Sequence, residues 1–294
     1  MADVDPNVRR RWLGLELRKV REATERTQRQ AARALEWSLS KLIRIESGAQ
    51  GISVTDLNAL LALYGVVDAD QVAALTAAAR GSHGQTWWNG YRDVVSSQFA
   101  WLLGAESHAV SLRVSHPFLL PGLLQTEAYA AALMGVFRDQ QGRMPRIIDL
   151  RIERQERFFS SGAESLFVIG EEALYRWYGG PGVMRRQLEH LLDMEQHPCV
   201  TIRILPFAGG SHPGVGSPFT LLRLREPEEE VLYIESINGD QLDRDEPDRI
   251  AEYAEYFEAM NGLALSREDG DALLMERIGT LRGAENPEAS RPEE

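Results

Sequence analysis

The sequence contains little of what disulfide-bonded or membrane proteins depend on. Its 294 residues include a single cysteine, Cys199, which excludes an internal disulfide and fits a reducing compartment. No apolar run approaches the roughly 18 residues that a membrane span needs, and the segment MADVDPNVRRRW lacks the apolar core of a secretory signal. These absences predict a soluble, cytoplasmic protein.

Catalytic signatures are missing as well. We find no HExxH, CxxC or GxSxG pattern and no Walker-type phosphate loop. His190 and His197 lie near Cys199, but histidines on a helix are more often solvated than bound to metal. The Gly-rich stretch 179–182 has no following Lys, Ser or Thr and is typical of a turn before a helix. We therefore expect no enzyme activity, no metal and no cofactor.

Positive charge is scarce and confined to one segment. The chain has a formal net charge of -12, yet residues 9–46 contain eleven Arg or Lys against five Glu. Both lysines of the chain, Lys19 and Lys41, lie there. That segment carries +6 and the remainder -18, so contact with a polyanion is expected only at this end.

The same segment contains the most informative pattern, two short helices joined by a tight turn at residues 27–48. Thr27 and Gln30 have the spacing of a capping box, Ser38 is a suitable N-cap for the second helix, and Gly48 ends it. Apolar residues recur at helical spacing in both helices: Ala31, Ala34 and Leu35 in the first, and Leu39, Leu42 and Ile45 in the second. The pattern is that of a DNA-reading helix-turn-helix.

Polar and basic side chains lie between the inward residues of the second helix. Arg can pair with the two acceptors of guanine, Ser can bond either base edge, and an apolar group can contact a thymine methyl. Gln28, at the start of the first helix, is positioned for a backbone phosphate, which fixes register without reading sequence. The residues that we expect to bind DNA are Gln28, Ser38, Leu39, Ser40, Lys41 and Arg44.

A single short amphipathic helix is most often just a solvated surface helix. The helices that flank residues 27–48 favour a DNA-binding domain over this simpler interpretation. An apolar stripe runs from Trp12 to Val20, Ser53 caps a Leu-rich helix, and Asp68 caps another that extends to Arg80. Five helices within residues 1–80 predict a compact all-α helix-turn-helix domain.

Residues 11–65 resemble the Xre/Cro-type repressor domain. The matching residues are Leu17, Arg21, Thr27-Gln28, Ala31-Ala32, Ser38 to Arg44 and Ile45-Glu46-x-Gly48. The resemblance implies that Arg21 and Glu46 form a structural pair bracing the first helix against the end of the recognition helix. One departure is Glu36-Trp37 in the turn, where this motif often holds glycine.

The rest of the chain predicts an α+β domain at residues 86–282, after a linker at 81–85 and before a disordered tail at 283–294. Short apolar or β-branched runs at 165–169, 200–205, 219–224 and 231–235 predict a small sheet. Helices are expected at 125–134, 146–159, 183–196, 248–260 and 267–281. An aromatic cluster at 86–104 indicates a domain joint or a dimer face. The Gly-rich loop 206–216 either covers a ligand or partner peptide or is a mobile surface loop.

This second part resembles the C-terminal domain of unassigned role that follows the repressor domain in many actinobacterial regulators. The most specific phrase is PGLLQT at residues 121–126, and others include Gly170-Glu171-x-Ala173-Leu174 and Pro218-Phe219-Thr220-Leu221. The resemblance implies an antitoxin-like regulator with a small companion protein, encoded nearby, that binds the chain and modulates its action on DNA.

The sequence thus predicts a homodimeric, sequence-specific transcriptional regulator of double-stranded DNA. A dimer is expected because two reading heads on a palindromic site combine their binding free energies. The alternative is a protein-interaction module that sequesters a partner and does not bind DNA. An enzymatic role for the second domain is a third possibility.

Overall fold

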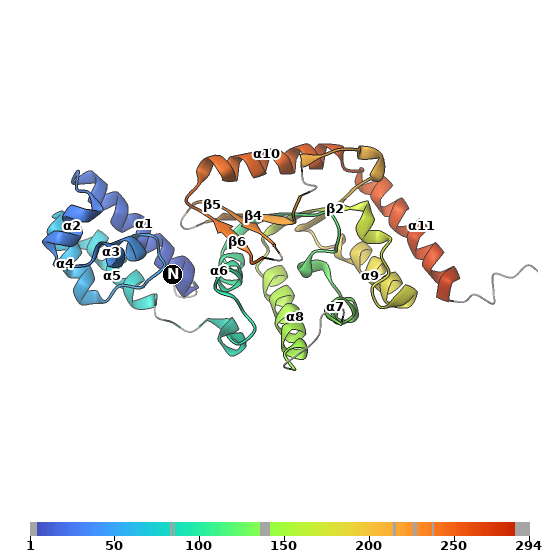
Figure 1. The fold of residues 1–294 in the computed structure, drawn as a ribbon, viewed down its shortest axis with the longest axis horizontal. Helices are drawn as coiled ribbons and strands as arrows, with labels where there is room; N and C mark the ends of the chain where they lie inside the picture. The colour runs from blue at the N-terminus through green and yellow to red at the C-terminus, as the bar shows by residue number, and fades with distance from the viewer. Residues whose placement is uncertain are drawn as a thin grey trace, which may run out of the picture. The chain divides into compact units, whose positions relative to one another are not determined.

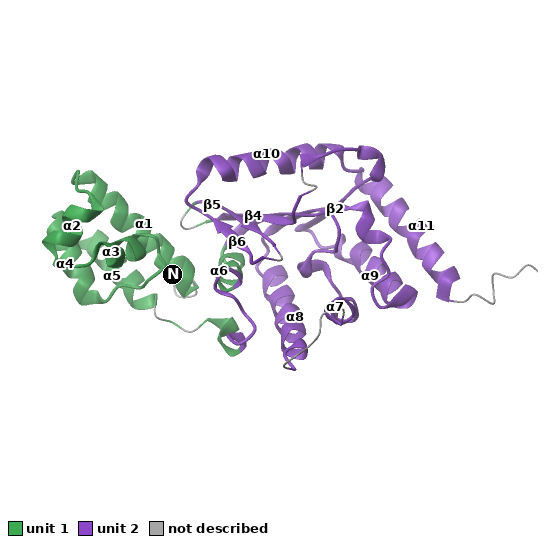
Figure 2. Cartoon of the chain, in the orientation of Figure 1, with its two compact units in different colours: residues 1–90, 100–108, 225–228 green, residues 91–99, 109–224, 229–294 purple. Residues whose placement is uncertain are grey.

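The computed structural model describes residues 5–82, 84, 86–135, 142–213, 216–225, 228–236 and 238–285. Figure 2 shows two units. Unit 1 consists of residues 1–90, 100–108 and 225–228, and unit 2 of residues 91–99, 109–224 and 229–294.

Unit 1 is helical, and its helices begin at the capping residues expected from the sequence. Thr27, Ser38, Ser53 and Asp68 each accept a hydrogen bond from a backbone N–H in the first turn, and Thr27 and Gln30 form a complete capping box. The elements are α1 (Pro6–Ala23), α2 (Gln28–Ala34), α3 (Leu39–Glu46), α4 (Val54–Tyr64), α5 (Ala69–Gly81), η1 (Trp87–Tyr91) and most of α6 (Ser97–Glu106).

The core of unit 1 joins all five of the first helices. Leu17, Leu42, Leu57 and Leu60 are fully buried, and Leu75 of α5 closes the same cluster. In the aromatic segment 86–104, Trp88 and Trp101 are also buried. These two rings are therefore buried within the chain, and the domain joint or dimer face stays a prediction.

The start of the expected linker belongs to α5. Gly81 is the last residue of this helix, and the Ser82 hydroxyl donates to the carbonyl of Ala79 at 2.6 Å. Residues 83 and 85 of the predicted 81–85 linker lie outside the described residues.

Unit 2 contains one six-stranded mixed sheet in the order β3-β2-β1-β4-β5-β6. Strands β1, β2 and β3 are parallel, whereas β4, β5 and β6 continue the sheet in antiparallel pairs. The strands are β1 (Ala109–His116), β2 (Glu164–Gly170), β3 (Val200–Leu205), β4 (Phe219–Leu224), β5 (Glu230–Ile234) and β6 (Gln241–Asp243). The four predicted strands match β2 to β5 within one residue.

The predicted sheet lacked two of these six strands, the inner β1 and the three-residue β6. Arg113 of β1 pairs with Glu230 and Glu258, at 3.0 Å from the latter, while Ser115 and His116 are buried. The run AVSLRVSH nevertheless alternates apolar and polar residues, which is a strand signal that the sequence prediction did not use.

Helices cover both faces of this sheet (Figure 1). Helix α10 packs on one face against Phe219, Leu221 and Leu232, and α7, α8 and α9 lie on the other. The helical elements are η2 (Gly122–Leu124), α7 (Glu127–Met134), α8 (Met144–Ser160), η3 (Glu171–Leu174), α9 (Gly180–Met194), η4 (Phe207–Gly209), α10 (Pro247–Leu263) and α11 (Arg267–Glu285).

Boundaries of the predicted helices 125–134, 146–159, 183–196 and 248–260 differ from α7 to α10 by up to three residues. Helix α11 continues to Glu285, beyond the predicted end at 281, so residues 283–285 of the expected tail are helical. Residues 286–294 lie outside the described part.

Two glycines set how closely α1 approaches the end of α3. A Cβ on Gly14 would lie 2.5 Å from the carbonyl oxygen of Glu46, and one on Gly48 would lie 2.7 Å from the Cα of Arg11. Gly48 also has a φ of 72°, which favours glycine. Backbone therefore packs directly on backbone here.

We expect Gly14→Ala to lower the free energy of unfolding by about 1–3 kcal/mol, because overpacking against a carbonyl outweighs the gain in helix propensity. Gly279→Ala in α11 is the matched control, since nothing lies within 4 Å of the added Cβ. It should instead stabilise by about 0.5–1 kcal/mol. Equilibrium urea denaturation measures both, and equal shifts in one direction would contradict the argument.

Candidate nucleic-acid interface

The turn between α2 and α3 is tight and holds an unusual residue. The backbone N–H of Trp37 donates to the carbonyl of Ala32 at 2.8 Å, and Glu36 has a φ of 56°. A left-handed backbone costs a non-glycine residue roughly 1–2 kcal/mol. Glu36 thus adopts the left-handed conformation for which glycine is favoured in such turns. The surrounding packing holds Glu36 in this conformation.

Helix α3 presents three exposed side chains on one face. Ser40, Ile43 and Arg44 are exposed, whereas Leu39 and Lys41 are half-buried. Ser38 serves as the N-cap, and its hydroxyl accepts from the backbone N–H of Lys41 at 3.2 Å. Ile43 is 42% exposed and was missed by the sequence analysis, although its apolar side chain at a position outside the inward period was a signal. It can contact a thymine methyl.

Lys41 does not extend freely from α3. Its Nζ lies 3.0 Å from Oδ2 of Asp56 and 3.8 Å from the centroid of the Trp37 ring. Both contacts compete with a phosphate or a base edge for the same ammonium group. Lys41 therefore lies on the predicted recognition helix but is engaged within the chain.

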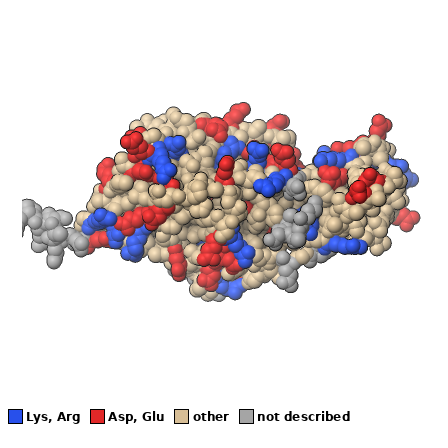
Figure 3. All heavy atoms as spheres, turned by 180° about the vertical axis from the view of Figure 1, so that it is seen from behind, with Lys and Arg blue, Asp and Glu red and all other residues tan. Residues whose placement is uncertain are grey.

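Most cations of the basic segment are engaged in a similar way. Figure 3 shows acidic and basic side chains interspersed on the face that it draws. Arg18, Lys19 and Arg21 all pair with glutamates. The basic side chains in 9–46 that are exposed and make no hydrogen bond or ion pair with any described residue are Arg26, Arg29, Arg33 and Arg44. All four belong to α2, α3 or the turn before α2, so within residues 9–46 the available positive charge lies on the helix-turn-helix.

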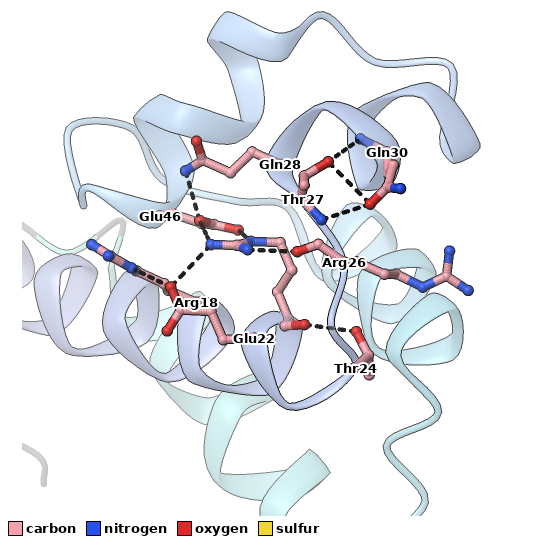
Figure 4. A network of polar contacts seen from close by, with 9 residues as sticks. Arg18, Glu22, Thr24, Arg26, Thr27, Gln28, Gln30 and Glu46 are labelled. Carbon is pink, nitrogen blue, oxygen red and sulfur yellow. Dashed lines mark hydrogen bonds and ion pairs between the residues drawn. The ribbon is translucent and has the colours of Figure 1, made fainter.

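A buried ion pair connects the first helix to the end of α3 (Figure 4). Nε and Nη2 of Arg21 donate to Oε1 and Oε2 of Glu46 at 2.7 and 3.0 Å. The two side chains are only 8% and 2% exposed. Nη1 of Arg21 also donates to the carbonyl of Arg26 at 2.7 Å. The hydrogen bonds to Glu46 raise the pKa of the Arg21 guanidinium, which stays charged.

Gln28 contacts this pair and is less free than the sequence analysis expected. Its side-chain amide donates to Oε2 of Glu46 at 2.8 Å. One amide hydrogen remains available for a phosphate oxygen. This hydrogen bond links the start of α2 to Glu46 at the end of α3. The second amide hydrogen of Gln28 can still donate to the DNA backbone.

In unit 2, the PGLLQT phrase has a structural explanation. Buried Gln187 of α9 accepts from the backbone N–H of Thr126 at 2.7 Å and donates to the carbonyl of Leu124 at 2.7 Å. Gln155 of α8 donates to the carbonyls of Gly122 and Gln125 at 2.7 and 2.8 Å. Side-chain amides thus satisfy the irregular backbone between β1 and α7.

Burial lowers the pKa of two titratable groups near the PGLLQT phrase. Burial lowers the pKa of His116 to about 4, so the ring is neutral at pH 7, and its Nδ1 accepts from the backbone N–H of Leu119. Burial, with the nearby charge of Arg154, lowers the pKa of Arg151 to about 10. Arg151 donates to Oε1 of Gln125. Arg151 thus belongs to the polar network, and His116 holds the backbone just before the PGLLQT phrase.

The loop 206–216 begins with η4, and the backbone N–H of Phe207 donates to Oε2 of Glu171 at 2.7 Å. Residues 214 and 215 lie outside the described part. Within the described ranges, no three His, Cys, Asp or Glu side chains are grouped to hold a metal ion. None of the helices in those ranges combines the length and apolar character needed to cross a membrane.

We expect Arg21→Ala to lower the free energy of unfolding by about 3–5 kcal/mol, because Glu46 is left buried without its cation. Arg18→Ala is the control. Its partner Glu22 lies on the same helix in water, so the free energy should remain close to that of the wild type. Urea denaturation of the two variants tests this, and a small effect of Arg21→Ala would show that the pair does not brace α1 and α3.

Comparison with known families finds two matching regions. Residues 12–75 match a family model described as a helix-turn-helix domain, which indicates a DNA-binding regulator. Residues 99–276, more than half of the chain, match the domain of unknown function DUF5753. No curated protein and no solved structure matches the chain. The chain therefore belongs to the DUF5753 family and has a helix-turn-helix domain at its N-terminal end.

Proposed function

We propose that this protein is a sequence-specific, Xre-type transcriptional regulator that reads double-stranded DNA with α3. The observation that carries the proposal is the exposed face of Ser40, Ile43 and Arg44 on a helix whose end is held by the buried pair of Arg21 and Glu46. A rigidly held short helix with polar, apolar and cationic side chains on one face suits the major groove.

Reading and positioning are assigned to different side chains. Arg44 can donate two hydrogen bonds to guanine, Ser40 can bond a base edge, and Ile43 can pack on a thymine methyl. Phosphates on either side are contacted by Gln28 and by the exposed guanidinium groups of α2 and the preceding turn. These contacts set affinity and register, whereas α3 sets sequence preference.

Unit 2 is proposed to serve dimerisation and reception of a small companion protein or ligand, as in antitoxin-like regulators of actinobacterial type. Two heads spaced by one turn of DNA, about 34 Å, would read a palindromic site. The proposed activity is binding and not turnover, without a cofactor, and the proposed location is the cytoplasm, where the DNA target lies.

Selection of bound fragments from random duplex DNA tests the proposal. A symmetric consensus, with affinity that falls steeply as salt rises, is expected. Failure of the folded full chain to bind any duplex at low salt would favour the alternative, a protein that sequesters a partner without binding DNA.

Arg44→Ala should cost about 1–3 kcal/mol of binding free energy and relax the preference at one base position. Gln28→Ala should weaken binding to all sequences by a similar factor, because it removes a phosphate contact. Fluorescence anisotropy with the consensus and single-base variants separates the two effects. Urea denaturation of Gln28→Ala is needed beside it, since Gln28 also contacts Glu46. Identical specificity profiles for the two variants would contradict the assignment.

Asp56→Asn should raise DNA affinity several-fold, because it releases Lys41 and removes a negative charge beside the interface. The salt dependence of binding should steepen by about one phosphate contact. Asp70→Asn is a matched control, since Asp70 also lies in the first turn of a helix of unit 1 but contacts no lysine. An equal gain from both substitutions would mean that net charge, and not Lys41, is responsible.

A further inference from the structure

Unit 2 brings two arginines of α8 together beside the segment that follows β1. A Cβ on Gly122 would lie 3.4 Å from Nη1 of Arg154 and 3.9 Å from Cζ of Arg151, so both guanidinium groups approach one point of the backbone. The guanidinium of Arg154 also lies over the Phe99 ring, with Cζ 5.2 Å from the ring centroid. Both arginines are half-buried, and they lie nearly one turn apart on α8.

Hydrogen bonds hold Arg151 in place without neutralising it. Its guanidinium donates to the uncharged Oε1 of Gln125 and makes no ion pair with any residue that the structure describes. Gln125 is itself fixed, because its Nε2 donates to the carbonyl of Leu120 at 2.6 Å and its own carbonyl accepts from Nε2 of Gln155 at 2.8 Å. The position of the Arg151 guanidinium is therefore set by the PGLLQT segment.

Positive charge exceeds negative charge around Arg151. The groups that act electrostatically on it are Arg154, Glu235 and Tyr129, and burial raises the pKa of Tyr129 to about 12, so that its phenol is neutral at pH 7. Two guanidinium groups against one carboxylate leave one positive charge in excess. Removing a cation from water is costly unless a counterion accompanies it. An anion bound beside the two arginines would offset this cost.

The two arginines lie where the topology of the sheet favours ligand binding. The chain passes from β1 to β2 and β3 on one side and then returns to β4 on the other, so the strand order reverses at β1. In open sheets with helical connections, ligands bind outside the carboxyl ends of the strands at such a point. The PGLLQT segment follows the carboxyl end of β1. Glu235 follows β5, which runs parallel to β1 because both are antiparallel to β4.

The geometry favours a phosphate group over a carboxylate. A single guanidinium engages both oxygens of a planar carboxylate in a fork arrangement. Two guanidinium groups beside one backbone position suit an anion with more oxygens, and phosphate offers these together with a charge of roughly -1.5 to -2 at pH 7. Because both arginines are half-buried, a small molecule can reach them more easily than the backbone of a duplex can.

We propose that Arg151 and Arg154, beside the backbone of Gly122, bind the phosphate group of a small phosphorylated ligand. The inference deepens the proposed function by naming the chemistry of the ligand that unit 2 receives, and it rests on that function for its regulatory purpose. Phosphate binding itself requires neither DNA nor a companion protein.

Equilibrium dialysis of the full chain against radiolabelled inorganic phosphate, at fixed chloride concentration, tests the inference. We expect saturable binding by the wild type. Arg151→Gln should raise the dissociation constant about 10-fold or more, because it removes a hydrogen-bonding charge. Arg157→Gln is the matched control on α8, since that guanidinium pairs with Glu153 at 2.8 Å, and it should leave the dissociation constant unchanged. Arg44→Ala should do the same, which separates this site from the basic helix-turn-helix.

Gly122→Ala is a second variant that keeps every charge. Its Cβ would make ordinary van der Waals contact with Arg154, so the fold should be retained. The methyl group would nevertheless occupy the position that both guanidinium groups approach. We therefore expect Gly122→Ala to weaken phosphate binding as well, even if Arg151→Gln fails to fold.

Competition identifies the ligand chemistry. Unlabelled methyl phosphate should displace the label as well as unlabelled phosphate does, whereas acetate should displace it poorly. The inference is overturned by a wild type without saturable binding, by Arg151→Gln and Gly122→Ala variants that bind as the wild type does, or by acetate that competes equally. Failure of methyl phosphate to compete would overturn the phosphorylated ligand in favour of the free ion.

DNA binding is measured separately, so the two failures are distinguishable. A chain that binds phosphate at this site but no duplex removes the proposed function alone. A chain that reads a specific DNA sequence but binds no phosphate removes the phosphate site alone.

Discussion

The ion pair between Arg21 and Glu46 is the interaction on which the candidate interface depends. It lies out of water, it is bidentate, and it receives a further hydrogen bond from Gln28. A buried charge must be paired, so α1, the start of α2 and the end of α3 can only be arranged as the pair allows. Close backbone contact at Gly14 and Gly48 enforces the same arrangement sterically. These buried contacts fix the orientation of the exposed face of α3.

The cations of the basic segment, residues 9–46, have two different roles. Several cations of the basic segment neutralise glutamates within unit 1 and contribute to its fold. The exposed guanidinium groups that remain without a described partner are on α2, α3 and the preceding turn. The formal excess of positive charge in residues 9–46 therefore overstates the number of cations in this segment that are available to a phosphate backbone. In unit 2, side-chain amides rather than ion pairs hold an irregular segment in place. Gln155 and Gln187 hydrogen-bond the backbone of the PGLLQT segment and hold it against α8 and α9.

Local signals in the sequence were reliable where the structure depends on neighbours in the chain. Capping residues such as Thr27 and Ser38 were recognised because their hydrogen bonds span three residues. The strands β2 to β5 were recognised because they are apolar. Strand β1 was missed although its apolar and polar residues alternate, and the glutamates that pair with its Arg113 lie more than a hundred residues away. The engagement of Lys41 by Asp56 and of Gln28 by Glu46 also escaped prediction, because helical spacing shows which residues face outward but not what they contact.

The sequence by itself determined the helix-turn-helix, the positions of its caps, the location of the basic segment and four strands of the sheet. Each of these follows from periodicity, capping chemistry or composition within a short stretch of chain. Tertiary structure alone decided that β1 is the inner strand between β2 and β4, that Ile43 is exposed and Lys41 engaged, and that the rings of Tyr175 and Phe207 from two separate segments come into contact. Those features depend on which distant residues come together, and that is settled by packing the whole chain rather than by any local pattern.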